Sequence, residues 1–149
     1  MTRKNLRIFL DTSVIIAAIL SATGGARRLF YLGEAGIIDL IIGQHVLGEI
    51  QSVVLRKAPA SLPNLALLLS TGRVETVPAH WESFFEKART LVSYPPDARV
   101  LAEVMSISPD WFITHDKEHF LHKTYPGLEF RIETPGGLLM HLRDDLLIP

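Results

Sequence analysis

The sequence predicts an α/β fold, a doubly wound and mostly parallel sheet of about five strands with helices on both faces. Short apolar runs of strand length alternate along the chain with longer segments whose apolar residues recur with helical spacing. Glycine and proline separate these segments, and no repeat, low-complexity tract or linker divides the chain. We therefore expect one domain over residues 1–149, within the usual domain size of about 100 to 200 residues.

The order of the expected elements follows from these periodicities. The first half of the chain should hold strands at residues 6–10 and 37–42 and helices at residues 13–20, 26–34, 44–57 and 62–70. The second half should hold strands at residues 73–77, 111–114 and 128–132 and helices at residues 81–92, 97–105 and 135–142. Because strands alternate with helices, the strands should run parallel and be covered on both faces.

The composition excludes several kinds of site. The net charge is −1 and the isoelectric point is about 6.6, so no broad basic surface for nucleic acid is expected. The absence of cysteine excludes disulfides, thiolate catalysis and cysteine-bound zinc. The mean hydropathy of +0.24 is high for a small soluble domain, so a partner or a second copy is expected to cover some apolar surface.

The N-terminus resembles a signal peptide, because Arg3, Lys4 and Arg7 precede an apolar run. Asp11 divides this run, and no other segment reaches the roughly 18 uninterrupted apolar residues that a membrane span requires. We therefore expect a soluble, cytoplasmic protein that makes no contact with a membrane.

Asp11 lies within the otherwise almost wholly apolar stretch LRIFLDTSVIIAAIL, residues 6–20. An unpaired buried carboxylate is costly, so a cation, hydrogen-bond donors or an exit to water should accompany it. Asp11 directly follows the first strand, and Asp116 comes just after Thr114 at the end of the fourth. Sites in open parallel sheets form beyond the carboxyl ends of the strands. The two aspartates should therefore meet at one edge if their strands are neighbours.

Two further acids, Asp97 and Glu49, occupy unusual positions. Asp97 falls on the inward-facing apolar stripe of its helix, and Glu49 borders the apolar stripe of another. Each of the four acids also has an ordinary explanation. Asp11 could cap the helix that follows it, and Asp97 could complement the dipole of its helix. Asp116 could stabilise a turn, and the Glu49 side chain could extend into water. Together they favour a metal site. Asp110 precedes the strand that ends near Asp116, about 18 to 20 Å away, so we assign it a structural role.

Four stretches of the chain resemble motifs of PIN-domain proteins, the nuclease-like family that includes the toxins of many bacterial and archaeal toxin–antitoxin pairs. FLDTSVIIAAIL resembles the opening motif, LGEI carries a glutamate at Glu49, PPDARVLAEVM carries a third acid at Asp97, and FITHDKEHF carries a fourth at Asp116. The resemblance covers nearly the whole chain. It departs at Ser13, where many members have asparagine, and at His115, where many have a small residue.

This resemblance implies that Asp11, Glu49, Asp97 and Asp116 are both the metal ligands and the catalytic residues of a ribonuclease. It also implies Glu118 as a further ligand, since some members carry an acid at that position. Oxygen ligands without cysteine suit Mg²⁺ or Mn²⁺, and two such ions about 3.5 to 4 Å apart could activate water and stabilise a leaving oxygen. Residues predicted to support the acids or to contact substrate are Thr12, Ser13, Thr114, Lys117, Arg27 and Arg28.

The predicted function is metal-dependent hydrolysis of single-stranded RNA by the toxin of a toxin–antitoxin pair. The alternatives are a stand-alone RNA-processing nuclease and a non-catalytic PIN-like binding module. A phosphatase of the haloacid-dehalogenase kind is disfavoured, because it needs an aspartate where Ser13 stands. A zinc site at His115, His119 and His122, which share helical spacing, is a further alternative.

The expected partners follow from the apolar excess and from the resemblance. Residues 14–20 and 65–69 are apolar stretches, and burial inside the fold explains the first of them. The second stretch, together with the resemblance, leads us to expect a homodimer. The resemblance implies a small cognate antitoxin that lays apolar side chains into a groove and places a basic residue near the acids.

Overall fold

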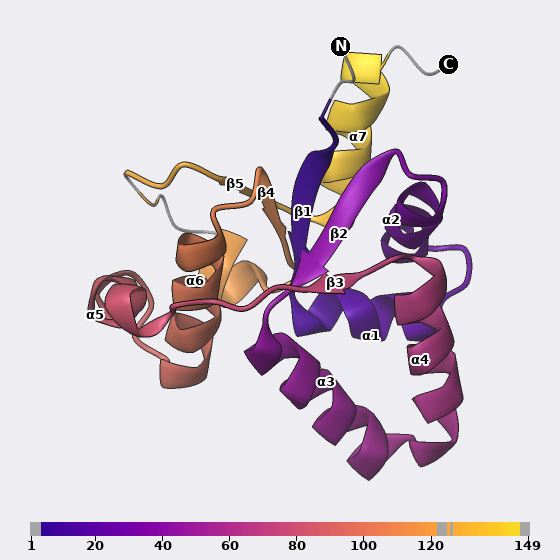
Figure 1. Ribbon diagram of the computed structural model, residues 1–149, viewed down its shortest axis with the longest axis horizontal. Coiled ribbons are helices and arrows are strands. Elements are labelled where there is room, and N and C mark those ends of the chain that lie inside the picture. Colours follow the sequence, from indigo (N-terminus) through magenta and orange to yellow (C-terminus); the bar gives the residue numbers. More distant parts are fainter. Residues whose placement is uncertain (1–3, 122–124, 126, 147–149) are drawn as a thin grey trace.

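The computed structural model describes residues 4–121, 125 and 127–146, apart from the side chains of Lys117, Asp145 and Leu146. Within these residues five strands form one sheet in the order β3-β2-β1-β4-β5, and every neighbouring pair is parallel (Figure 1). The strands are β1 (Leu6–Leu10), β2 (Ile38–Ile42), β3 (Glu75–Thr76), β4 (Trp111–Ile113) and β5 (Arg131–Glu133). The predicted α/β class with a parallel sheet is confirmed.

Helices cover both faces of the sheet. They are α1 (Thr12–Leu20), α2 (Gly25–Glu34), α3 (Gln44–Lys57), α4 (Leu62–Thr71), α5 (Glu82–Leu91), α6 (Pro95–Ile107) and α7 (Pro135–Leu146), with a 3-10 turn η1 (Pro59–Ser61) and a π-helical turn η2 (Lys117–Leu121). In Figure 1, α5 and α6 lie together on one side of the strands, whereas α1, α2 and α4 lie on the other, and α7 packs against α2. The helices that precede β4 lie on the second face because the chain leaves β3 at one edge of the sheet and crosses back past β1 to enter β4.

Two strands differ from their predicted bounds by more than one residue. The third strand was expected at residues 73–77, but Arg73 has a positive φ of 54° and the Val74 N–H bonds back to α4, so both belong to the turn that ends this helix. The fifth strand was expected at residues 128–132 and lies at Arg131–Glu133, because pairing with β4 begins with Arg131 opposite Trp111. Apolar periodicity located these strands, but hydrogen bonding to the neighbouring strand sets their limits.

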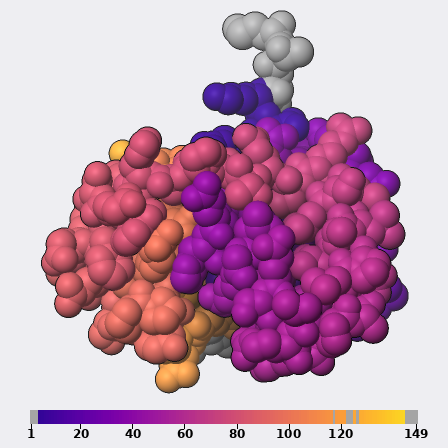
Figure 2. All heavy atoms as spheres, turned by 60° about the horizontal axis from the view of Figure 1, so that its bottom comes forward, coloured from indigo at the N-terminus to yellow at the C-terminus, as the bar shows by residue number. Residues whose placement is uncertain are grey.

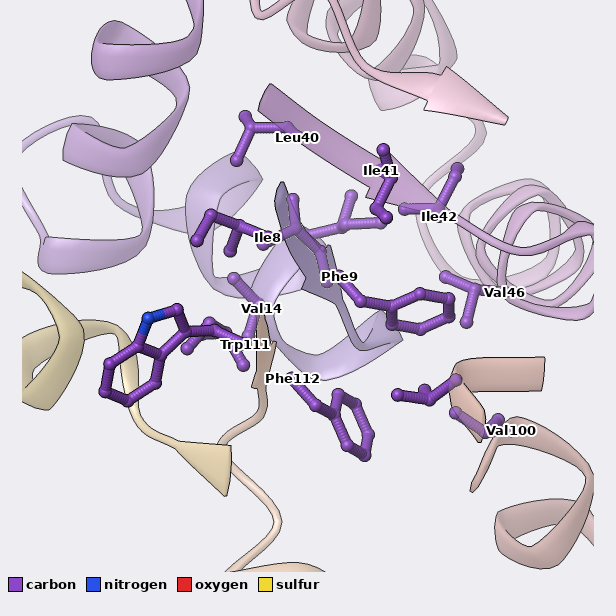
Figure 3. Close-up of a cluster of buried hydrophobic side chains, with 14 of the residues drawn as sticks. Ile8, Phe9, Val14, Leu40, Ile41, Ile42, Val46, Val100, Trp111 and Phe112 are labelled. Atoms are coloured by element: carbon purple, nitrogen blue, oxygen red, sulfur yellow. The ribbon is translucent and has the colours of Figure 1, made fainter. Parts of the chain in front are cut away.

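The core lies on both faces of β1 (Figure 3). Phe9 and Phe112 are paired across β1 and β4, and their rings meet edge to face with centroids 5.6 Å apart. Figure 3 shows both rings on the side where Val100 of α6 lies, whereas Ile8 and Trp111 point the opposite way. Successive strand residues alternate between faces, so a strand buried on both sides must be apolar throughout. This explains the continuous apolar run that precedes Asp11.

The first helix, α1, is apolar nearly all round, as the sequence predicted. Val14, Ile15 and Ala18 are fully buried, whereas Leu20 at its end is exposed. Among the residues described, no single helix is long and apolar enough to cross a membrane. The pair α1 and α2 reaches that length and composition only together, and the two are bent by 96° at the break between them.

Candidate functional site

The carboxyl ends of β1 and β4 bring the predicted acids to one edge of the sheet. Because β1 and β4 are neighbours, the Asp11 N–H donates to the carbonyl oxygen of Ile113 at 3.0 Å and so continues the strand pairing. Figure 2 turns this edge toward the reader and shows α3 in purple beside the salmon and orange chain of α6. These helices supply Glu49 and Asp97, respectively. The edge therefore collects side chains from four separate elements.

Asp11 is held by two hydroxyl groups. Thr114 Oγ1 donates to Asp11 Oδ2 at 2.7 Å, and Ser13 Oγ donates to the same oxygen at 3.1 Å. The aspartate is 9% exposed, and this burial raises the pKa of its carboxyl group although the hydrogen bonds oppose the shift. The nearby charge of Glu49 raises the pKa further. Asp11 is thus a rigid carboxylate whose charge is poorly solvated.

The same hydroxyl groups fix the loop after β4. Thr114 Oγ1 accepts the Asp116 N–H at 3.0 Å, and Ser13 Oγ accepts the His115 N–H at 3.0 Å. Each hydroxyl therefore bonds Asp11 on one side and the loop backbone on the other. This arrangement places Asp116 relative to Asp11 without direct contact between the two carboxylates.

Asp97, Asp116 and His119 form the tightest polar cluster at this edge. Asp97 lies in the first turn of α6, and His119 lies one turn beyond Asp116, in η2. Nδ1 of His119 is 2.9 Å from Asp116 Oδ2 and 3.1 Å from Asp97 Oδ2. One ligand atom from each residue can be chosen so that all three lie within 4.8 Å of one another. These distances suit three ligands of one metal ion.

The electrostatics of the cluster reflect its crowded charges. Burial raises the pKa of Asp97 to about 6, and the charges of Asp116, Asp11 and Glu49 add to this shift, whereas His119 opposes it. The pKa of His119 is raised, mainly by its hydrogen bond to Asp116 and also by the neighbouring carboxylates. Without a cation, the carboxylates at this edge destabilise one another.

The other predicted ligands lie at the margin of the cluster. Glu49 is partly exposed on α3, and its Oε2 is 3.5 Å from His45 Nε2. It influences the pKa values of both Asp11 and Asp97, so it lies near them, but it is not among the three clustered ligands. Glu118 is exposed.

The residues predicted to support the acids or contact substrate fall into different places. Ser13 and Thr114 contact Asp11, whereas Thr12 is buried and its Oγ1 bonds no other atom that the structure describes. The Arg27 guanidinium donates from Nε and Nη2 to the carbonyl oxygen of Ala18, near the end of α1.

Within the described part of the chain, the remaining basic and histidine residues form no second metal site. Arg28 is exposed, and the side chain of Lys117 lies outside the described part of the structure. Of the histidines in the zinc alternative, His115 is exposed, His119 belongs to the acid cluster, and His122 lies outside the described residues.

Two residues of this region were not predicted as part of an acid site. His119 was considered only with the other histidines, although its position three residues after Asp116 places both on one face of a helical turn. Glu103 is 1% exposed in α6, and its Oε1 accepts the His45 N–H at 3.0 Å in the first turn of α3. A glutamate within the apolar run VLAEVM was the available signal.

The donor atoms fit a divalent cation. Asp97 Oδ2 is buried and accepts no hydrogen bond from the residues that the structure describes, although it faces His119 Nδ1. A buried carboxylate oxygen without a donor is costly, and a cation shared with Asp116 would remove that cost. Carboxylate oxygens and an imidazole nitrogen are common ligands of divalent metals in proteins.

Comparison with known proteins assigns the chain to a family. The family model for the PIN domain matches residues 7–118, which include Asp11, Glu49, Asp97 and Asp116. The chain belongs to the PIN domain family. The resemblance inferred from the sequence motifs is thereby confirmed. No curated protein sequence matches this PIN domain.

Solved structures share the fold of this PIN domain at low sequence identity. VapBC2 from Rickettsia felis, bound to a DNA fragment from its promoter, has a TM-score of 0.69 and 19% identity over 87% of this chain and 98% of the other. VapC20 from Mycobacterium tuberculosis, a sarcin–ricin loop cleaving toxin, has a TM-score of 0.53 and 22% identity over 79% of this chain and 96% of the other. FitAB bound to a DNA fragment has a TM-score of 0.50 and 17% identity over 86% of this chain and 94% of the other.

Proposed function

We propose that this PIN domain is a metal-dependent endoribonuclease that hydrolyses phosphodiester bonds of single-stranded RNA in the cytoplasm, as the toxin of a toxin–antitoxin pair. The cluster of Asp97, Asp116 and His119 beside the buried Asp11 supports this function. The fold shared with VapC20, a sarcin–ricin loop cleaving toxin, supports the same reaction class. The cofactor is Mg²⁺ or Mn²⁺.

The residues at the edge have distinct tasks in this reaction. Asp97 and Asp116 would hold the ion, with Asp11 and Glu49 close by as further carboxylates. A bound divalent ion polarises water and offsets the charge of the phosphodiester. Thr114 and Ser13 fix Asp11 Oδ2 through their hydrogen bonds and leave the carboxylate little freedom to rotate. Such supporting contacts typically affect metal affinity or activity about 10- to 100-fold.

Metal dependence and substrate class can be tested on the purified protein. With Mg²⁺ or Mn²⁺ it is expected to cut unstructured RNA, and excess EDTA is expected to stop the reaction, because in this mechanism the bound ion activates the attacking water. Duplex RNA and single-stranded DNA of the same sequence serve as control substrates. Cleavage that persists in EDTA would rule out the metal mechanism, and preferential cleavage of DNA would rule out the substrate class.

The toxin role requires an antitoxin. VapBC2 and FitAB are complexes solved with DNA fragments, and both share the fold of this chain. A groove between α2 and α4 offers a docking surface, and it is lined by Arg27, Phe30, Tyr31, Glu34, Asn64, Leu67, Leu68 and Thr71. A small gene for a DNA-binding protein beside this one would favour the toxin role over a stand-alone processing nuclease.

We propose a homodimer whose contact surface includes the exposed side of α4. Within residues 65–69, Leu65 and Leu68 face the core, whereas Leu67 is 63% exposed. Light scattering at micromolar concentration is expected to give the mass of a dimer, and Leu67→Glu is expected to give a folded monomer, because a carboxylate opposes apolar contact. A monomeric wild-type protein would remove the homodimer proposal.

A further inference from the structure

His119 places a nitrogen where a third metal ligand would lie. Its Nδ1 is 2.9 Å from Asp116 Oδ2 and 3.1 Å from Asp97 Oδ2. Around an octahedral ion with bonds of about 2.1 Å, neighbouring ligand atoms are about 3.0 Å apart, because they subtend a right angle at the ion. The imidazole nitrogen therefore lies from each of the two carboxylate oxygens at the distance expected between ligands on adjacent corners of an octahedron.

Contacts outside the cluster fix the orientation of the His119 ring. The ring stacks on Tyr94 with centroids 5.9 Å apart and planes inclined by 21°. The His119 N–H donates to Asp116 Oδ1 at 3.0 Å, and its carbonyl oxygen accepts the Tyr125 hydroxyl at 2.6 Å. Backbone and ring are thus both held, so Nδ1 faces the carboxylates without any ion present.

A hydrogen bond alone does not account for this geometry. Nδ1 carries at most one proton, depending on the tautomer, and a proton directed to Asp116 Oδ2 leaves the second carboxylate without a hydrogen bond from this nitrogen. Asp97 Oδ2 is left buried without a donor in the described structure. One cation would contact all three atoms, whereas one proton joins only two of them.

We propose that Nδ1 of His119 is a ligand of the metal ion held by Asp97 and Asp116, and that this nitrogen makes the site prefer Mn²⁺ to Mg²⁺. The proposal rests on the metal site of the proposed function and specifies which ion it selects. Mg²⁺ takes oxygen ligands almost exclusively, whereas imidazole binds first-row transition metals. Removal of the nitrogen should therefore weaken Mn²⁺ binding more than Mg²⁺ binding.

Calorimetric titration of the metal-free full-length protein tests this preference. His119→Phe keeps a ring to stack on Tyr94 but has no nitrogen, and His80→Phe is the matched control because its exposed ring lies outside the cluster. His119→Phe is expected to lower Mn²⁺ affinity at least about tenfold and to change Mg²⁺ affinity much less. His80→Phe is expected to bind both ions like the wild type. Unchanged or tighter Mn²⁺ binding by His119→Phe would overturn the proposal.

A spectroscopic measurement reports the ligand directly and does not depend on the variant folding. Electron spin echo envelope modulation of the Mn²⁺-loaded wild type is expected to show coupling to a nitrogen nucleus, and its absence would overturn the proposal. A wild type that shows this coupling but cuts no RNA would retain the His119 ligand and remove the proposed function. RNA cleavage without nitrogen coupling would support the proposed function and overturn the assignment of His119 as a ligand.

Discussion

Replacing Asp11 with asparagine is expected to lower RNA cleavage at least about a hundredfold, more than the loss of a supporting contact typically costs. The change removes one negative charge from the metal edge and almost no volume. The asparagine carbonyl oxygen can still accept the hydrogen bonds that Thr114 and Ser13 donate to Asp11 Oδ2. The expected loss is therefore a loss of charge at the site, and the fold should remain intact.

The same variant is expected to be more stable than the wild type in EDTA. Burial raises the pKa of Asp11 above its ordinary value of 3.8, so between that value and the higher folded pKa the native state binds more protons than the unfolded state. Stability of the wild type therefore falls as the pH rises through this window. Asparagine removes this dependence, so its advantage in melting temperature should be larger at pH 8 than at pH 5.

Asp110→Asn is a matched control for Asp11→Asn. Asp110 Oδ2 accepts the Arg7 N–H at 2.8 Å at the opposite end of β1, far from the acid cluster. This variant should retain RNA cleavage, because no charge at the carboxyl edge changes. Cleavage near the wild-type rate by Asp11→Asn, or an equal loss in Asp110→Asn, would contradict the assignment of Asp11.

The sequence predicted the elements that burial dictates. Residues 8–10 of β1 had to be apolar because helices cover both faces of the strand there, and this made Asp11 conspicuous directly after them. The position of Asp116 followed from the same reasoning, because parallel neighbours end at one edge. Both inferences needed only strand ends and the direction of pairing.

Contacts between distant elements could not be predicted in the same way. Arg27 of α2 was predicted to contact substrate, but its guanidinium donates to the carbonyl oxygen of Ala18 in α1. This contact depends on how α2 packs against α1. The position of His119 between two carboxylates depends on the approach of α6 to η2. The spacing of His119 and Asp116 along the chain predicts that these two residues are neighbours. It does not predict the distance between His119 and Asp97.

Glu103 is a buried residue whose removal is expected to destabilise the protein by about 2 to 4 kcal/mol, somewhat below the cost of breaking a fully buried ion pair, because Arg99 remains partly exposed. Its Oε1 accepts the His45 N–H at 3.0 Å and lies 3.6 Å from Arg99 Nε. The Arg99 guanidinium also stacks over the Trp81 ring at 3.7 Å. Glu103→Ala removes the acceptor for the first turn of α3, the helix that carries Glu49. Urea denaturation measures the loss.

Gly43 reveals how closely Glu103 packs against the start of α3. A Cβ atom at Gly43 would lie 2.0 Å from Glu103 Oε2, and φ is −89°, so the requirement for glycine is steric and not conformational. Gly43→Ala is expected to cost about 1 to 3 kcal/mol, as overpacked sites do. Gly48→Ala in the same helix is the control. Its Cβ meets nothing within 4 Å, so it should gain up to about 1 kcal/mol from helix propensity.

The double variant separates the steric clash from any other effect of alanine at residue 43. Glu103→Ala removes the carboxylate atoms at 2.0 and 2.8 Å and leaves only the residue 103 Cβ at 3.4 Å, so Gly43→Ala should then cost about 0.5 kcal/mol, because alanine is a poorer helix cap than glycine. The two substitutions should therefore be coupled by about 0.5 to 2.5 kcal/mol in urea denaturation. Additive effects would mean that Gly43 and Glu103 do not pack together and that the start of α3 is held by other contacts.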